Sequence, residues 1–357
     1  MKAPVVAHIA ASVGGPHAPA TRAEREQAEG VKLAPGATRA TGSGNRMQPE
    51  APDRLRTCFE RDLDRIQHSR PFRRLAGKCQ VFISPEDDHL RTRLTHAIEV
   101  CQVAVGIARP VGLNVALTAA AATGHDCGHG PAGHASEAAL SRFVPGGYHH
   151  AVYGADVVLA PLNLCAETLD AIRNHSWNRP APSTPEGEVV AWADRIAYVC
   201  HDLEDALDAG IVGTDDLPPA VADILGRDRR SQLHALITAM VETIAETGTV
   251  ALRAAEAEAL AAFRAFNYER IYFRPESVAQ AEQAGRLIGQ LAEFFSTHPG
   301  LVGGATHPEE PLAGLVPGSP TAVAAAVRYV SGMTDRFAHA CALDHLGWDP
   351  RMLPRSA

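Results

Sequence analysis

Apolar residues recur at helical spacing along most of the chain after Leu55, with charged residues between them. Alternation typical of strands is scarce, and Val81 to Ile83 is the best short candidate. The pattern therefore predicts an all-α fold. The helices are expected at about 94–108, 113–123, 137–143, 150–160, 164–174, 188–209, 229–247, 250–268, 276–297 and 320–342.

Two kinds of segment fall outside this helical pattern. Residues 1–50 are rich in Ala, Gly, Thr and Pro without a sustained apolar period, which predicts a disordered tail. Loops rich in Gly and Pro are expected at 179–187 and 299–319. The tail is therefore expected over residues 1–50, and the helical part of the chain follows it.

Composition and charge exclude several classes of protein. The 33 Lys and Arg residues against 41 Asp and Glu give a net charge of −8, which disfavours non-specific nucleic-acid binding. No apolar run approaches the roughly 18 residues that a membrane span needs. The seven Cys form no CxxC pair, which argues against a disulfide scaffold or a zinc ribbon. A reducing cytoplasm is the expected location.

Histidines gather in one part of the chain, where nine of the 17 lie between His89 and His201. The adjacent His125 and Asp126 end a helix that the Ala-rich pattern predicts to be buried. A buried imidazole and carboxylate are costly without a partner, and a bound cation is the natural compensation. The glycines that follow would allow the backbone to approach a ligand closely. A single His-Asp pair is common, however, so the case depends on other positions.

Polar residues on two further helices supply those positions. Arg93 and His96 are three residues apart and share one helix face. Asp194, Tyr198 and Asp202 follow at four-residue intervals and form one polar stripe on a long helix. A solvated surface explains Asp202 easily, but apolar neighbours surround Asp194 and make a surface position less natural for it.

The order His96, His125-Asp126, Asp194 resembles the signature of the HD-domain metal-dependent phosphohydrolases. The chain is more specifically similar to the deoxyguanosinetriphosphate triphosphohydrolase-like family, from about Arg56 to Val212. The C-terminal helices resemble the family only loosely. The segments that carry the resemblance include Phe59–Ser69, Phe72–Leu75, Lys78–Phe82, Arg91–His96, His125–Glu137, Glu186–Val190 and Asp194–Asp202.

This resemblance implies an HD-domain helical bundle as a core over residues 51–212, and a C-terminal helical region over residues 213–357 that packs on this core. It also implies a role for particular residues. The implied metal ligands are His96, His125, Asp126 and Asp194. The implied catalytic residues are His134, Glu137 as the acid that orients it, and His150. The implied substrate-binding residues are Arg93 and Arg195 facing phosphates, His129 lining the same pocket, and Tyr198 and Asp202 meeting the sugar.

The implied reaction is the hydrolysis of a deoxynucleoside triphosphate at its α-phosphorus, which gives a deoxynucleoside and tripolyphosphate. Two imidazoles and two carboxylates suit Mn²⁺, Fe²⁺, Co²⁺, Ni²⁺ or Zn²⁺ better than an all-protein Mg²⁺ cage, and Mn²⁺ is the expected ion. The resemblance also implies a homo-oligomer and leaves room for a nucleotide effector.

Some positions depart from the family pattern. Ala132 stands where the family has Phe, Ser136 where it has Gly, and Ala151 where it has Asn, preceded by an additional His149. None of these changes removes a side chain with an implied catalytic role. Two alternatives stay open: an HD-domain nucleotidase or phosphodiesterase for another nucleotide, and a catalytically weak nucleotide-sensing regulator.

A basic cluster allows two interpretations. Arg73, Arg74 and Lys78 lie close together in the sequence and could reach the phosphates of a substrate. They could equally form the solvated face of a helix.

Overall fold

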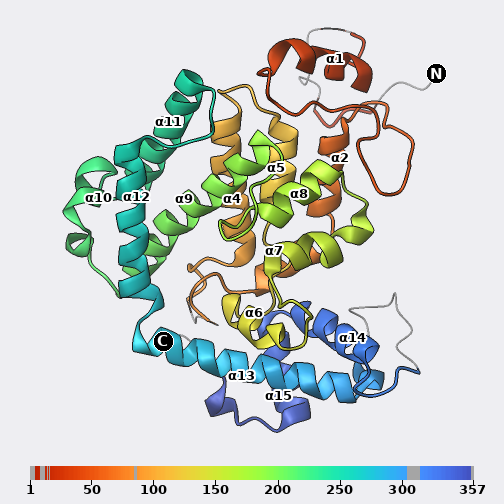
Figure 1. The fold of residues 1–357 in the computed structure, drawn as a ribbon, viewed down its shortest axis with the longest axis vertical. Coiled ribbons are helices and arrows are strands. Elements are labelled where there is room, and N and C mark those ends of the chain that lie inside the picture. The colour runs from red at the N-terminus through yellow and green to blue at the C-terminus, as the bar shows by residue number, and fades with distance from the viewer. Residues whose placement is uncertain are drawn as a thin grey trace.

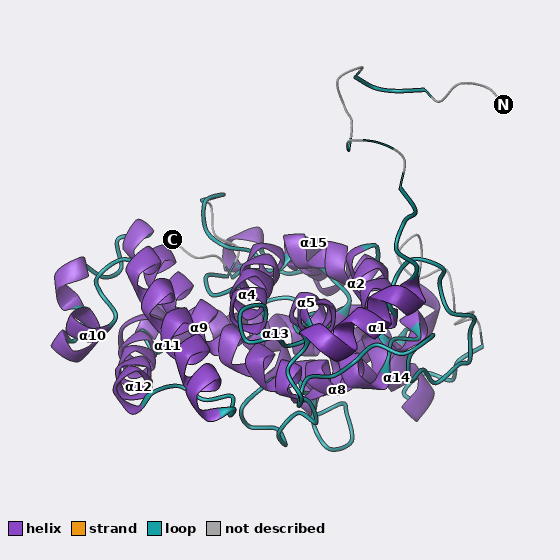
Figure 2. Cartoon of the chain, turned by 90° about the horizontal axis from the view of Figure 1, so that it is seen from above, coloured by secondary structure: helices purple, strands orange, loops and turns teal. Residues whose placement is uncertain are grey.

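The computed structural model describes residues 5–8, 13, 15, 17–83, 87–303 and 314–354. These residues form fifteen α-helices and no strand (Figure 2), which confirms the predicted all-α fold. Val81 to Ile83 lie in a bend. Among the described residues, β pairing is limited to two isolated bridges, Arg46 with Cys165 and Cys79 with Thr92. Part of the predicted tail and residues 304–313 of the predicted loop lie outside the described residues.

The central helices pack around a helix of small residues. This helix, α5 (Val115–Gly124), is buried along most of its length because alanine lets neighbouring helices approach closely. It packs against α2 (Cys58–Gln67), α4 (Arg93–Ala108), α8 (Ala166–Asn174) and α9 (Pro185–Asp208). Figure 1 shows α4, α5, α8 and α9 together in the middle of the molecule. The C-terminal end of α5 therefore delivers His125 and Asp126 into the core.

The next helices extend this core. These are α10 (Pro219–Ile224), α11 (Arg229–Thr247) and α12 (Ala254–Asn267), of which α10 falls where no helix was expected. The helices α11 and α12 pack against α9, and their buried residues join the same hydrophobic cluster (Figure 1). The predicted division at residue 212 thus falls inside this cluster.

A second hydrophobic cluster forms around the long helix α13 (Pro275–Thr297). It includes α6 (His134–Ser141), α14 (Pro320–Ser331) and α15 (Asp335–Leu346), which lie along α13 in Figure 1. The helix expected over 320–342 is divided, because α14 ends at Ser331, just before Gly332, and the Thr334 side chain caps a new helix. No helix in the described ranges, α9 and α13 included, has both the length and the apolarity to cross a membrane.

Two short helices complete the fold near the predicted site. The helix α3 (Arg70–Arg74) follows α2, and α7 (His150–Tyr153) continues into a π-helical turn over Gly154–Val158. Gly128 makes this arrangement possible, since a Cβ there would lie 2.0 Å from the carbonyl oxygen of His150. Gly128 is one of the glycines expected to let the backbone approach a ligand. In the structure it lets the backbone approach α7 instead.

The disordered tail predicted for residues 1–50 extends too far along the chain, because part of this segment is folded. Residues Arg22–Lys32 form α1, whose first turn has a capping box between Thr21 and Glu24. Further along, Thr38 donates two hydrogen bonds to the buried carboxylate of Glu186, at 3.0 and 2.7 Å. Polar contacts hold this segment against the core. Such contacts leave no apolar period in the sequence, so the pattern of apolar residues did not predict them.

Candidate active site

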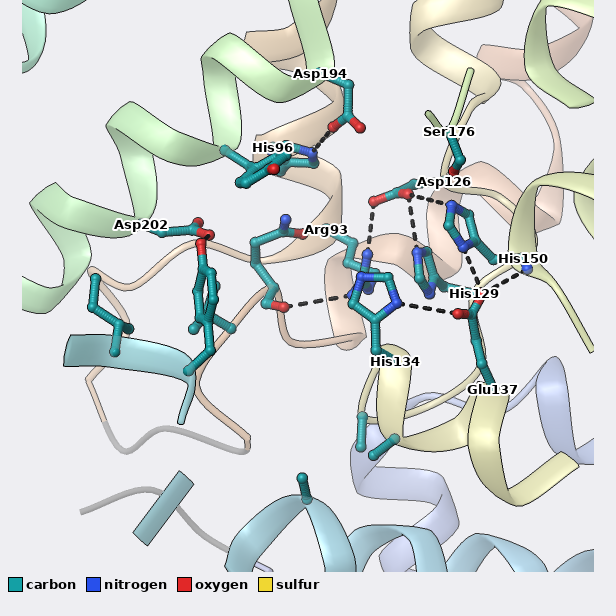
Figure 3. A pocket seen from close by; sticks show the side chains of 18 of the residues that line it. Arg93, His96, Asp126, His129, His134, Glu137, His150, Ser176, Asp194 and Asp202 are labelled. Carbon is teal, nitrogen blue, oxygen red and sulfur yellow. Dashed lines mark hydrogen bonds and ion pairs between the residues drawn. The ribbon is translucent and has the colours of Figure 1, made fainter. Parts of the chain in front are cut away.

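A cavity of about 730 Å³ opens where α4, α9, α12, α13 and the loop between α5 and α6 meet. All of the predicted site residues except His125 line this cavity, and His125 lies beneath its inner end. Figure 3 shows Asp194 and Asp202 on one helix, with Asp126, His129, His134 and Glu137 on the facing side. The fold thus brings together residues that are far apart in the sequence.

Two imidazoles and two carboxylates meet at the inner end of the cavity. His96 Nε2 lies 3.1 Å from Asp194 Oδ1 (Figure 3). His125 Nε2 lies 3.5 Å from Asp126 Oδ1 and 3.6 Å from Asp194 Oδ1. These are the four residues that the resemblance implies as metal ligands. The ligand atoms of His96, His125 and Asp194 lie within 4.8 Å of one another, and Asp126 joins them through His125.

The donor atoms of this cluster fit a cation. His125 Nδ1 donates a hydrogen bond to the carbonyl oxygen of Ala122 at 2.7 Å, so the Nε2 of the neutral ring carries a lone pair. This buried Nε2 has no hydrogen-bond partner and faces carboxylate oxygens, which also carry lone pairs. Only a positive charge between them makes this arrangement favourable.

The electrostatics of the metal-free cluster support the same conclusion. Burial alone would lower the pKa of His125, but the charges of Asp126 and Asp194 outweigh burial and raise it to about 9. Conversely, burial would raise the pKa of Asp194, but contacts with His125 and His96 hold it well below its usual range. In the absence of a metal ion, a proton on His125 supplies the positive charge that the carboxylates require.

Asp126 is held by additional contacts. Arg93 Nη1 lies 2.8 Å from Asp126 Oδ2, and His129 Nε2 lies 3.2 Å from Asp126 Oδ1. Gly133, with φ of +57°, is required beside this pair, since a Cβ there would lie 2.3 Å from Arg93 Nη2. Arg93 therefore lines the cavity as predicted, but its guanidinium is already paired with a carboxylate.

Glu137 connects two histidines. Its Oε2 lies 3.1 Å from His134 Nδ1, and its Oε1 accepts hydrogen bonds from both the backbone nitrogen and Nδ1 of His150 (Figure 3). Burial would raise the pKa of Glu137, but these hydrogen bonds hold it far below its usual range. The sequence suggested only that Glu137 orients His134, and the structure adds His150.

A further histidine that the sequence reasoning missed belongs to this group. His175 is buried at the end of α8, and its Nε2 lies 3.2 Å from His150 Nε2. Its donor atom also lies close to those of His125 and Asp126. The sequence feature that could have identified His175 is its position in the histidine-rich part of the chain.

At the far end of the cavity Asp202 is buried. Its carboxylate accepts a hydrogen bond from the hydroxyl of Tyr272, and burial raises its pKa to about 8. The interpretation of Asp202 as a solvated surface acid is therefore wrong. Arg264 donates a hydrogen bond to the hydroxyl oxygen of Tyr198 at 2.9 Å. Sequence reasoning missed Tyr272 and Arg264, because they lie beyond residue 212, where the sequence analysis identified only a loose resemblance.

Lys78 fits neither interpretation of the basic cluster. It is 2% exposed and donates hydrogen bonds to the carbonyl oxygens of His129 and Ser331. Burial lowers its pKa to about 7. Lys78 thus ties the loop that carries His129 to the end of α14 and contacts neither solvent nor the cavity.

The residues that depart from the family pattern are accommodated without displacing the site. Ala132 has φ of +56°, and its backbone nitrogen donates to Asp335 Oδ1 at 2.9 Å. Ser136 is buried and donates to the carbonyl oxygen of Gly133 at 2.6 Å. His149 lines the cavity beside Asn178, at 3.1 Å.

Comparisons with known proteins agree with this geometry. The HD domain pattern matches residues 93–199, and a phosphohydrolase-associated domain pattern matches residues 250–342. A deoxyguanosinetriphosphate triphosphohydrolase-like protein of Caldanaerobacter subterraneus is 39% identical over 321 residues, which cover 88% of this chain and 92% of that protein. A protein of the same description from Desulfatibacillum aliphaticivorans is 35% identical, with 89% and 95% covered.

Proposed function

Because this chain belongs to the deoxyguanosinetriphosphate triphosphohydrolase-like family of HD-domain proteins, we propose that it hydrolyses deoxynucleoside triphosphates to deoxynucleosides and tripolyphosphate with the help of a divalent metal ion. The observation that carries this proposal is the cluster of His96, His125, Asp126 and Asp194 at the inner end of a cavity. The relatives' names point to the substrate class.

These four residues would hold the metal ion, for which Mn²⁺ is the proposed identity. A divalent ion in this place supplies Lewis-acid polarisation of a phosphoryl group. Arg93 and His129 would fix the orientation of Asp126 through the contacts described above.

His134 is the proposed proton-transfer residue. Its Nδ1 faces the ionised Glu137, so Nδ1 carries the proton and Nε2 is left free to accept or return one. The side chain of His134 is 75% exposed, so a substrate in the cavity can reach it. His150, held by the other oxygen of Glu137, would keep that carboxylate in place.

The sugar would lie along α9. Tyr198 and Asp202 follow Asp194 at about 6 and 12 Å along the helix axis, from a rise of about 1.5 Å per residue. This is the length scale that separates an α-phosphate from its deoxyribose. Tyr198 would pack on the sugar ring and Asp202 would bind the 3′-hydroxyl, while Arg195 would face the phosphates.

One experiment tests the proposed function. Purified protein is incubated with Mn²⁺ and each deoxynucleoside triphosphate in turn, and the products are separated by ion chromatography. Tripolyphosphate in equal amount to deoxynucleoside supports the proposal. Release of monophosphate or pyrophosphate would favour another nucleotidase, and nucleotide binding without turnover would favour a nucleotide-sensing regulator. Light scattering with and without nucleotide tests the proposed homo-oligomer and effector.

A further inference from the structure

Trp177 and Arg195 are stacked at the wall of the cavity. The guanidinium carbon of Arg195 lies 3.3 Å from the centroid of the Trp177 ring. Trp177 lies in the segment that follows α8, whereas Arg195 follows Asp194 on α9, and both residues line the cavity. The contact therefore joins two separate elements beside the proposed metal site.

The indole ring is held in place by α9. Its Nε1 donates a hydrogen bond to the carbonyl oxygen of Ala191, one helical turn before Arg195, at 3.0 Å. Trp192 meets the ring edge-on, with centroids 4.6 Å apart. Trp177 is 48% exposed, so these two contacts determine its orientation more than burial does.

Arg195 differs from the other guanidinium groups of the cavity. Arg93 is paired with Asp126, and Arg264 is bonded to tyrosine hydroxyls. Arg195 forms no ion pair within the described part of the chain, and its buried Nε has no hydrogen-bond partner. A ring that holds the flat face of a guanidinium leaves the N–H groups at its edge free for an anion.

We infer that Trp177 is a positioning residue that holds Arg195 ready for the polyphosphate part of the substrate. The inference rests on the proposed function, because it assumes that phosphates enter this cavity. The ring attracts the cation and fixes the plane of its N–H groups without neutralising its charge, as a carboxylate would do. A smaller aliphatic side chain at position 177 would leave Arg195 free to rotate away.

The test measures binding of inorganic tripolyphosphate, which has neither sugar nor base, to the Mn²⁺-loaded protein by calorimetry. Trp177→Leu is expected to weaken binding about tenfold, within the range of a partly desolvated cation–π contact. Trp177→Phe keeps an aromatic face and should lose less. Trp348→Leu is the matched control, because the Trp348 indole bonds Gln290 and does not line the cavity.

A double-mutant cycle with Arg195→Gln identifies the route of the effect. If Trp177 acts through Arg195, adding Trp177→Leu to Arg195→Gln causes no further loss of tripolyphosphate affinity. With a deoxynucleoside triphosphate, the loss in the Trp177→Leu single variant should fall on KM more than on kcat. Thermal unfolding of each variant shows that the fold is retained.

Three results would overturn the inference. They are unchanged affinity of Trp177→Leu for both tripolyphosphate and deoxynucleoside triphosphates, additive losses in the double variant, and weaker binding of deoxynucleoside triphosphates alone. The last result would mean that the ring contacts the base. The proposed function fails separately. If the variants show the expected cycle with tripolyphosphate but the wild-type protein releases no tripolyphosphate from any deoxynucleoside triphosphate, the proposed function alone is contradicted. Wild-type protein that neither binds tripolyphosphate nor hydrolyses these substrates would overturn both.

Discussion

Replacing Asp202 by Asn should stabilise the protein at alkaline pH. The folded protein holds the pKa of Asp202 at about 8, above its ordinary value of 3.8, because the side chain is buried. The folded state therefore binds more protons than the unfolded state between these values, and stability falls as pH rises through this window. The slope is about 1.4 kcal/mol per pH unit, which integrates to about 2.7 kcal/mol between pH 6 and pH 9.

Asparagine cannot ionise, so Asp202→Asn should not lose this stability. Urea unfolding at pH 6 and pH 9 measures the free energy of unfolding of both proteins, and groups other than Asp202 contribute equally to both. The advantage of the variant should grow by about 2 to 3 kcal/mol from pH 6 to pH 9. The exposed Asp223→Asn is the control and should show no such growth. Parallel pH profiles for wild type and Asp202→Asn would refute the reasoning.

The remaining predictions concern the metal and the substrate. Asp126→Ala should abolish bound metal and activity together, and stoichiometric metal by mass spectrometry would contradict the ligand assignment. His134→Ala should keep metal and nucleotide binding but lose about 10² to 10⁴ in kcat, whereas near-normal kcat would exclude it from proton transfer. Since the pKa of His125 is raised from 6.5 to about 9, metal-free protein should lose stability as pH rises through this window. Metal binding at pH 7.5 should then release about one proton, which calorimetry in buffers of different ionisation enthalpy detects. Asp202→Ala should weaken a normal substrate strongly and its 3′-deoxy analogue hardly at all, and equal losses would mean that Asp202 supports only the fold.

Most of the helices were predictable because each buries an apolar stripe that appears in the sequence as a regular period. The division between α14 and α15 was missed because that period continues across Gly332, while the cap at Thr334 is a single polar residue. The segment before residue 50 was missed for a related reason. Its hydrogen bonds to Glu186 join residues that are far apart in the sequence and leave no local pattern.

The candidate site was predictable where a motif carries it. The residues from His96 to Asp194 occur in a recognisable order, and the structure brings them together. The contacts of His175 and Tyr272 were not predictable, because they depend on how α8 and the turn after α12 pack against the motif. The raised pKa of Asp202 likewise follows from burial by elements distant in the sequence.

The most direct test of the proposed function is a single turnover experiment in water labelled with ¹⁸O. The Mn²⁺-loaded protein is mixed with a deoxynucleoside triphosphate, and both products are analysed by mass spectrometry. Attack of water at the α-phosphorus predicts an unlabelled deoxynucleoside and tripolyphosphate that carries one ¹⁸O atom. Label in the deoxynucleoside, or phosphate and pyrophosphate in place of tripolyphosphate, would contradict the proposed reaction.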